Sequence, residues 1–509
     1  MTDVLFTHSY FLRFDPKEFR AMMPYPPLGT LYAAACTREA GFTVSLFDSM
    51  FAESASDISG HLAAQRPRAV VMYDDDFNYL TKMCLTRMRH AAFEMSELAR
   101  NAECAVIVHG SDASDHCAEY LAHGADYVII GEGEQTLVEL LNLLLSGKGR
   151  AADIPGLAYM QGNEVVRTEA RRVLKDLDSL PFPARDLLDI GQYREAWTKR
   201  HGYYSLNIVT TRGCPFHCNW CAKPIYGQVY NCRSPQSVVA EMRFLKETLN
   251  PDHIWFCDDI FGLKPGWVAE FRDEVLRQEA LIPFKCLARV DLLLKGNTVS
   301  DLREAGCRTV WVGAESGSQK ILDAMDKGTT VDQIYEASRL LTRHGIGVGF
   351  FLQYGYPGEL QDDIALTMKM VRDCSPDEIG ISVSYPLPGT PFYDSVRLQL
   401  GEKQNWVDSQ DLAMMFQGTY TPAFYRILHK VTHKKFRLWK VTELLRNVLG
   451  HRPVPPLNIR SLAAAMYHWF TLPLYEARLG YLSRTRRATA LAPRRLRRRN
   501  HRRHTMTAG

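Results

Sequence analysis

The chain lacks the features that mark exported and membrane-spanning proteins. Its first ten residues (MTDVLFTHSY) contain no basic stretch followed by a long apolar run, so no signal peptide is expected. No stretch of about 18 uncharged apolar residues occurs, which argues against a spanning helix. Nine of the twelve cysteines are scattered singly, as reduced core cysteines usually are. Together these absences predict a protein of the reducing cytoplasm.

An arginine-rich stretch late in the sequence has no acidic residue to balance its charge. Arg484–Arg503 carries ten arginines, and because the whole chain has a net charge of +4, the rest carries −6. We interpret residues 484–509 as a solvated, disordered tail; the alternative is contact with an anionic membrane, and a nucleic-acid partner is not expected. The apolar stretch Leu462–Leu482 is broken by Pro473 and two charges. It fits a membrane surface or a helical cap on the preceding domain, and we expect the cap.

Short apolar runs alternate with helical patterns in residues 1–146. Strands and helices alternating in this way predict a doubly wound parallel sheet, on which ligands bind beyond the carboxyl ends of the strands. The candidate helices include Gly29–Ala40, Leu80–Arg100 and Gln135–Leu145. The candidate strands are Val4–Thr7, Val44–Asp48, Ala69–Tyr73, Ala105–His109 and Tyr127–Ile130.

Residues 147–200 have a different character. Gly156–Thr168 is typical of a hairpin turning at Gly162-Asn163, and Leu180–Ala184 (LPFPA) is proline-rich and extended. We interpret this span as a linker or cap between two domains.

Residues 201–400 return to strand–helix alternation with six strands. Six units are fewer than the eight of a closed barrel, so a partial (β/α)6 barrel is expected, with its chemistry at the carboxyl ends of the strands. Residues 401–483 are helical and aromatic. The candidate strands are Leu206–Thr210, His253–Cys257, Phe284–Ala288, Thr309–Gly313, Gly347–Tyr354 and Ile379–Ser384.

The three clustered cysteines are Cys214, Cys218 and Cys221, in the sequence RGCPFHCNWC. They follow the first barrel strand closely. Three thiolates within eight residues can hold one corner of a small cluster, whereas ordinary [4Fe-4S] clusters use four cysteines. A missing fourth ligand leaves one iron open for catalysis, as in catalytic zinc sites. The alternatives are a zinc site that includes His217, or an electron-transfer cluster with a remote fourth cysteine.

CxxxCxxC with an aromatic residue before the last cysteine resembles the radical S-adenosylmethionine (SAM) superfamily. The resemblance implies a [4Fe-4S] cluster whose open iron is chelated by SAM. It also implies a SAM site at the strand ends of the barrel, where the Asp pair alternatively caps a helix. The residues that match superfamily positions for SAM are Asp258, Asp259, Arg289, Glu315, Ser316 and Gly317.

The N-terminal domain resembles the cobalamin-binding domain found upstream of many radical SAM domains. The motifs are YPPLG at residues 25–29 and GADYVIIGEGE at residues 124–134. The DxHxxG motif, which supplies a cobalt ligand in many cobalamin proteins, is absent, as in many members of this subfamily. A domain that no longer binds cobalamin is the alternative. The cobalamin-site candidates are Pro27, Gly29, Tyr73, Asp74, Gly110, Ser111, Gly131, Glu132 and Gly133.

The resemblance implies reductive cleavage of SAM to a 5′-deoxyadenosyl radical. The expected outcome is C-methylation of an unactivated carbon of a small-molecule or lipid-like substrate. The alternatives are cyclisation or rearrangement without methyl transfer and, from a different class, a nucleic-acid-binding or redox iron–sulfur scaffold. The expected partners are an electron donor of the flavodoxin or ferredoxin type and an unidentified substrate. Peripheral membrane contact is the alternative for the C-terminal region.

Overall fold

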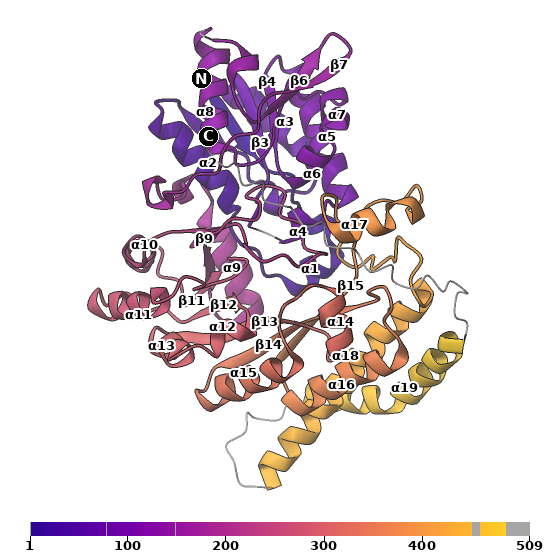
Figure 1. The fold of residues 1–509 in the computed structure, drawn as a ribbon. Helices are drawn as coiled ribbons and strands as arrows, with labels where there is room; N and C mark the ends of the chain where they lie inside the picture. The colour runs from indigo at the N-terminus through magenta and orange to yellow at the C-terminus, as the bar shows by residue number, and fades with distance from the viewer. Residues whose placement is uncertain (1, 78, 148, 450–458, 485–509) are drawn as a thin grey trace, which may run out of the picture.

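The computed structural model describes residues 2–77, 79–147, 149–449 and 459–484. Two β-sheets dominate it, one from the first third of the chain and one from the middle (Figure 1). The N-terminal sheet lies above the second sheet in this view, and the long C-terminal helices lie below and to the right. The arginine-rich residues after Arg484 lie outside the described residues, and the tail expected there stays a prediction.

The N-terminal sheet has seven strands in the order β2-β1-β3-β4-β5-β6-β7, and the first five are parallel. β3 and β1 are buried along their whole length, as expected of parallel strands covered on both faces. Helices α2 and α8 pack together on one face, and α3 and α5 pack together on the other. The doubly wound parallel sheet is therefore confirmed. Its elements are β1 (Val4–Thr7), α2 (Leu28–Glu39), β2 (Val44–Leu46), α3 (Ile58–Gln65), β3 (Ala69–Tyr73), α5 (Thr86–Asn101), β4 (Ala105–His109), α7 (Cys117–Ala122), β5 (Tyr127–Ile129) and α8 (Glu134–Ser146).

The expected hairpin forms, but it belongs to the N-terminal sheet. β6 (Leu157–Gln161) pairs antiparallel with β5, and β7 (Glu164–Arg167) pairs with β6. Gly162 makes the turn with φ +63°, a left-handed conformation that suits glycine. The first part of residues 147–200 therefore extends the sheet, and the linker proper runs from there to α9 (Ile190–His201).

The second sheet has six parallel strands in the order β15-β14-β13-β12-β11-β8, each beside its predecessor in sequence. Helices connect the strands, so the sheet is the predicted partial (β/α)6 barrel. Phe256 of β11, Phe271 of α11 and Phe284 of β12 pack on one another between these strands and the helix that covers them. Its elements are β8 (Ser205–Ile208), α10 (Pro235–Thr248), β11 (His253–Phe256), α11 (Trp267–Arg277), β12 (Phe284–Ala288), α13 (Thr298–Glu304), β13 (Cys307–Glu315), α15 (Val331–Arg343), β14 (Gly347–Tyr354), α16 (Gln361–Cys374) and β15 (Glu378–Val383). The shorter helices are α1 (Pro16–Ala21), α6 (Ser111–Asp115), α12 (Val290–Leu293), α14 (Gln319–Ala324) and α17 (Pro391–Val396).

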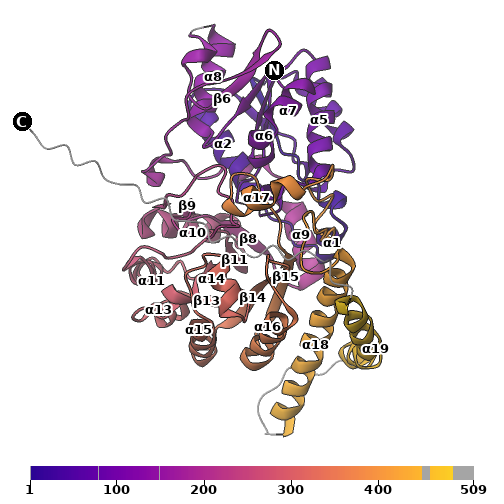
Figure 2. The same cartoon turned by 45° about the vertical axis from the view of Figure 1, so that its right-hand side comes forward.

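The chain ends in two long helices, α18 (Pro422–Leu449) and α19 (Ile459–Arg484). α18 packs against α16 and β15, whereas α19 packs against α18 and lies on its outer side (Figures 1 and 2). The expected helical cap on the barrel is therefore wrong for this stretch. The helix also continues through Pro473 instead of breaking there. Among the described helices, none has the length and apolarity needed to cross a membrane.

The segment around residues 402–411 crosses back to the N-terminal domain. Ser409 donates from its Oγ to Asp15 Oδ1 (2.7 Å), and Thr86 donates from its backbone N–H to the Trp406 carbonyl (2.9 Å). The latter contact lies where the single expected helix Leu80–Arg100 divides into α4 (Tyr79–Lys82) and α5. Cys84, at φ +54°, makes the break between the two helices.

Candidate active site between the two sheets

The loops that follow the strands of both sheets meet each other. Lys82, the last residue of the helix α4 that follows β3, donates to Asp259, just beyond β11, at 2.8 Å. Phe77 stacks on Tyr226 with ring centroids 5.8 Å apart. Ligands bind beyond the carboxyl ends of strands in open parallel sheets and in barrels alike. The two predicted sites therefore face a common region between the sheets.

The cysteine loop spans the two strands of a small antiparallel hairpin, β9 (Thr211–Arg212) and β10 (Asn231–Cys232). Gly213 opens the loop at φ +78°, and a side chain there would collide with the Val229 carbonyl. In the middle of the loop, Asn219 donates to the Ala324 carbonyl (2.8 Å) and accepts from the Tyr356 hydroxyl (2.8 Å). The barrel therefore holds the loop at its start and at its centre.

The three thiols suit a cluster better than a single ion. All are free; Cys214 is buried, and Cys218 and Cys221 are half-buried. Burial raises the pKa of the Cys221 thiol to about 12, and neighbouring Asp259 adds to the rise. Iron would supply the positive charge that a buried thiolate needs. In the described part of the chain, no group of three His, Cys, Asp or Glu side chains is gathered closely enough for one metal ion.

Asp258 and Asp259 have different partners from those expected. Asp258 accepts from Thr210 N–H (2.6 Å), Thr210 Oγ (2.7 Å) and Thr211 N–H (2.8 Å), at the start of the cysteine loop. Burial raises its pKa to about 6. Its oxygens thus already accept three hydrogen bonds from the protein, and a further contact with the SAM amine stays a prediction. Neither aspartate caps a helix, because the next helix begins at Trp267.

Arg289 contacts the cysteine loop and Glu315 binds a buried lysine, while the SAM contacts predicted for both residues stay predictions. The Arg289 guanidinium is centred 3.6 Å from the ring of Phe216, which lies between the first two cysteines. Glu315, at φ +56° where β13 ends, accepts from Lys327 Nζ at 2.8 Å. Burial lowers the pKa of Lys327, but the Glu315 carboxylate more than offsets this and raises it overall. Lys327 was not found from the sequence, because it follows a helix instead of a strand.

Ser316 and Gly317 face a helix instead of the shared region. The Ser316 hydroxyl lies 3.1 Å from Thr367 Oγ, and Gly317 N–H donates to the same oxygen at 3.0 Å. A side chain at Gly317 would collide with the backbone of Leu366 in α16. This glycine lets β13 and α16 pack closely, and its contact with SAM stays a prediction.

The predicted cobalamin loops come together, but several of their groups serve the protein. Asp74 accepts from the Ser9 N–H (2.7 Å), and Gly29 N–H donates to Asp75 Oδ1 (3.0 Å). Tyr73 stacks on His109, with centroids 3.8 Å apart. The other residues predicted for the cobalamin site shape the backbone of these loops. Pro27 precedes α2, and Gly110 and Gly131 have φ of +149° and +78°. A side chain at Gly133 would meet Tyr73 and His109.

Some buried polar atoms at these strand ends have no hydrogen-bond partner in the described structure. They are both carboxylate oxygens of Asp76, Nδ1 of His109 and Oγ of Ser111. Asp76 Oδ2 and His109 Nδ1 lie 3.5 Å apart, without the geometry of a hydrogen bond. Burial raises the pKa of Asp76 well above its usual value, and the carboxylates of Asp75 and Asp74 raise it further. Burial lowers the pKa of His109 to about 4. Uncharged groups with unused hydrogen-bonding capacity suit a large ligand rich in amides, such as a corrin.

Arg212 joins the two predicted sites. Its guanidinium donates to Glu134 Oε1 (2.6 Å) and Oε2 (3.2 Å) and also to Glu132. Glu132 lies on the loop after β5, and Glu134 is the first residue of α8. All three side chains are buried. The ring of Tyr226 lies 5.2 Å from the guanidinium. Glu132 was predicted to contact cobalamin, but it is an ion-pair partner of the residue two positions before Cys214.

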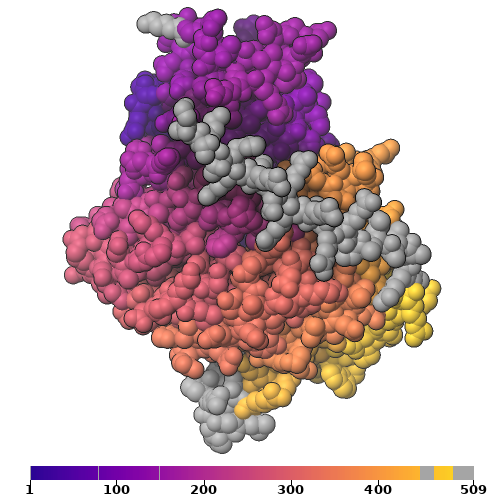
Figure 3. All heavy atoms as spheres, viewed as in Figure 1, coloured from indigo at the N-terminus to yellow at the C-terminus, as the bar shows by residue number. Residues whose placement is uncertain are grey.

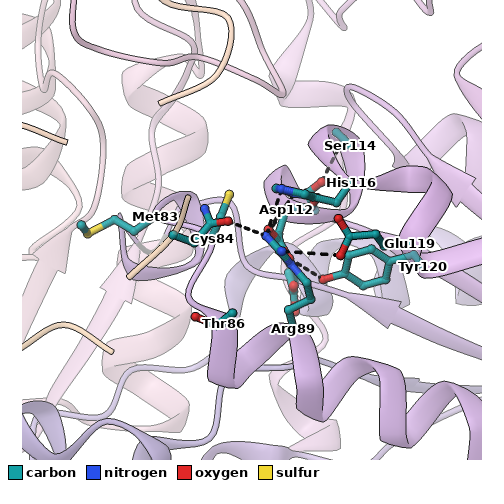
Figure 4. Close-up of polar contacts among 12 residues, drawn as sticks. Met83, Cys84, Thr86, Arg89, Asp112, Ser114, His116, Glu119 and Tyr120 are labelled. Atoms are coloured by element: carbon teal, nitrogen blue, oxygen red, sulfur yellow. Dashed lines mark hydrogen bonds and ion pairs between the residues drawn. The ribbon is translucent and has the colours of Figure 1, made fainter. Parts of the chain in front are cut away.

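A second buried network holds the loop after β4 (Figure 4). Arg89 donates from Nε and Nη2 to the two oxygens of Asp112, at 2.8 and 2.6 Å. The Tyr120 hydroxyl donates to Asp112 (2.8 Å), and Arg89 also donates to Asn405 (3.0 Å). A cavity of about 510 Å³ lies beside Arg89. Because Asp112 is the second residue of α6, the network fixes the helix that begins with Ser111.

Residues 208–371 match the family model of the radical SAM superfamily. This part of the chain is a radical SAM domain. The match runs from the last residue of β8 into α16, so the radical SAM domain contains the cysteine loop, Arg289 and the Glu315–Lys327 pair. The cluster and SAM sites that the sequence predicts therefore lie within the matched domain.

Curated relatives align over most of the chain. An uncharacterized methyltransferase of Pyrococcus horikoshii is 27% identical over 389 residues, 75% of this chain and 81% of the relative. Bacteriochlorophyllide d C-8(2)-methyltransferase of Chlorobaculum tepidum is 24% identical over 78% of this chain and 85% of the relative. The anaerobic magnesium-protoporphyrin IX monomethyl ester cyclase of Rubrivivax gelatinosus is 28% identical over 55% of this chain and 52% of the relative.

Two solved structures share the fold beyond the radical SAM domain. The radical SAM methyltransferase TsrM of Kitasatospora setae, solved with cobalamin and a [4Fe-4S] cluster, superposes with a TM-score of 0.64 at 20% identity, over 78% of each chain. The cobalamin-dependent radical enzyme OxsB, solved with aqua-cobalamin and SAM, superposes with a TM-score of 0.69 at 16% identity, over 94% of this chain and 72% of OxsB. The N-terminal sheet is thus part of a shared two-sheet fold.

Proposed function

We propose that this chain is a cobalamin-dependent radical SAM enzyme that methylates an unactivated carbon of a small-molecule or lipid-like substrate. The observation that carries the proposal is that Arg212 joins two sets of loops. One set is the cysteine loop, and the other buries polar atoms of Asp76, His109 and Ser111 that have no hydrogen-bond partner in the described structure. TsrM and the two methyltransferase relatives support methyl transfer.

Three cysteine thiolates would hold the cluster, and the strand-end loops of the N-terminal sheet would hold the corrin. When bound, the cluster and SAM supply a carbon-centred radical, and cobalamin supplies a methyl carrier. Asp258 keeps the start of the cysteine loop fixed through its three hydrogen bonds. We place Arg289 and the Glu315–Lys327 pair around SAM, where a guanidinium suits a carboxylate.

The protein also shapes the space between the sheets. Phe77, Tyr226 and the loop that carries Lys82 exclude water there, so a reactive radical meets few competing hydrogen donors. We propose a flavodoxin or ferredoxin as the electron donor, because the cluster needs one-electron reduction. All twelve cysteines are free, which fits the reducing cytoplasm that both the cluster and this donor require.

The test is anaerobic expression with cobalamin, reconstitution, and measurement of iron, sulfide and corrinoid on the same sample. We expect about four irons and one corrinoid per chain. Cys214→Ala is expected to lose iron and keep corrinoid. Ser111→Leu, which puts a bulky side chain in place of the unpartnered hydroxyl, is expected to lose corrinoid and keep iron. Each variant is the folding control for the other. Iron without corrinoid in the unmodified chain would exclude the methylcobalamin chemistry, and zinc in place of iron would exclude the whole proposal.

The cyclase relative supports a second candidate function, ring closure without methyl transfer. Product mass separates the two, because only methylation adds a carbon and two hydrogens to the substrate. Substrate-derived product of unchanged carbon count, formed with 5′-deoxyadenosine, would favour the cyclase.

A further inference from the structure

The outer face of α19 is an apolar surface that the described residues leave exposed, except at one edge, where Lys434 Nζ of α18 lies 4.3 Å from the ring centroid of Tyr467. Its side chains are 56–71% exposed, although most of them are large and hydrophobic. They recur at helical spacing, so they line one side of the helix. The members of this outer face are Met466, Tyr467, Trp469, Phe470, Leu474 and Tyr481.

The opposite side of α19 is tied to α18, which fixes the direction of the outer face. Lys434 on α18 donates to Thr471 Oγ at 2.7 Å, and Arg437 lies 3.0 Å from Nε2 of the buried His468. Figure 2 shows the two helices side by side, with α19 away from both sheets, and Figure 3 shows part of α19 in yellow at the molecular surface. The outer face therefore points away from the catalytic domains.

The two helices that carry this face are strongly basic. Together they contain ten lysines and arginines and two glutamates. Both glutamates are paired: Glu476 with Lys435 at 2.7 Å, and Glu443 with Lys440 at 3.1 Å. The sequence after Arg484 adds nine more arginines and no acid. The apolar face is thus flanked by unneutralised positive charge.

We propose that α19 lies flat on an anionic lipid bilayer, with the aromatic side chains of its outer face at the level of the headgroups and acyl chains. Tryptophan and tyrosine favour this depth, and lysine and arginine favour anionic headgroups. Charge argues against a second copy of the chain as the occupant, because two such surfaces would bring their basic residues together. The inference goes beyond the proposed chemistry and does not depend on it.

The test is flotation of the full chain with vesicles of phosphatidylcholine alone, or of phosphatidylcholine with phosphatidylglycerol. We expect binding to the anionic vesicles, weakened by salt. The double variant Trp469→Ser/Phe470→Ser is expected to bind them at least about tenfold more weakly, since two large apolar groups leave the bilayer. Leu398→Ser is the matched control: Leu398 is 96% exposed and lies elsewhere, so this variant is expected to bind as the unmodified chain does.

Circular dichroism and gel filtration of the same samples distinguish lipid binding from misfolding and from self-association. A double variant that keeps its helix content and elutes as the unmodified chain does, yet fails to float, supports the proposal. Equal flotation of the double variant, or equal binding to neutral vesicles, overturns it. A dimer of the unmodified chain that the double variant abolishes also overturns it, because the face would then belong to a second copy. None of these measurements needs turnover, so their failure leaves the proposed radical chemistry intact.

Discussion

Arg212 offers the sharpest test of how the two sheets are joined. Its side chain is 3% exposed, and those of its partners Glu132 and Glu134 are 6% and 5% exposed. Arg212→Gln would leave two carboxylates buried without their cation, and removing one partner of a buried ion pair costs about 3–5 kcal/mol. Because the carboxylates can relieve part of this cost by taking up protons, we expect a loss of about 3 kcal/mol.

The measurement is the urea unfolding transition followed by circular dichroism. The matched control is Arg243→Gln, which breaks an ion pair with Glu247 whose side chains are 57% and 59% exposed. Exposed pairs of this spacing contribute about 0.3–0.5 kcal/mol, so the two arginine variants are expected to differ several-fold. In the Arg212→Gln background, adding Glu134→Gln is expected to recover stability, because it removes one stranded charge. Equal, small losses for both arginine variants would refute the reasoning.

Three further changes test single contacts. Glu359→Gln replaces a carboxyl whose pKa burial raises from 4.5 to about 8. Between these pH values the folded state keeps the Glu359 proton while the unfolded chain releases it. The stability of the unmodified protein therefore falls as pH rises from 4.5 to about 8. The melting-temperature advantage of the variant should therefore grow over that window and vanish below it, and a pH-independent difference would contradict this. Gly317→Ala should destabilise by about 1–3 kcal/mol in urea, unlike Gly401→Ala, which has open space around it. Asp258→Asn should reconstitute with less iron than Asp259→Asn, since the former anchors the cysteine loop; equal iron would exclude that role.

The strands could be predicted well because they are short apolar runs rich in β-branched residues. β1, β3, β4, β12 and β14 have the expected bounds, and the other barrel and sheet strands that were expected differ by one or two residues at their ends. The hairpin was recognised from its turn, but its membership of the N-terminal sheet depends on pairing with β5, which local pattern does not encode. The break between α4 and α5 was missed because Thr86 N–H bonds to Trp406, 320 residues away.

The candidate site was predicted in position more than in role. A motif at the end of a strand marks the region, so the cysteine loop, Arg289 and Glu315 lie where expected. Which of these groups are already hydrogen-bonded within the protein depends on neighbouring elements. Asp258 accepts from Thr210, just after β8, and Glu132 accepts from Arg212. Lys327 and Asp76 carry no motif, and their importance follows only from burial and from the partners they have or lack.

The segment that returns from residues 402–411 to the N-terminal domain affects the order of folding. Asp15 and Arg89 belong to the N-terminal domain, whose sheet strands are all synthesised by residue 167. Yet Asp15 accepts a hydrogen bond from Ser409, and Arg89 donates one to Asn405. Nascent chains generally fold their domains in order from the N-terminus. Until the ribosome has passed residue 409, the stretch between α4 and α5 lacks its bond to Trp406. A chain stalled before this point should therefore be cut there by protease more readily than the full-length protein.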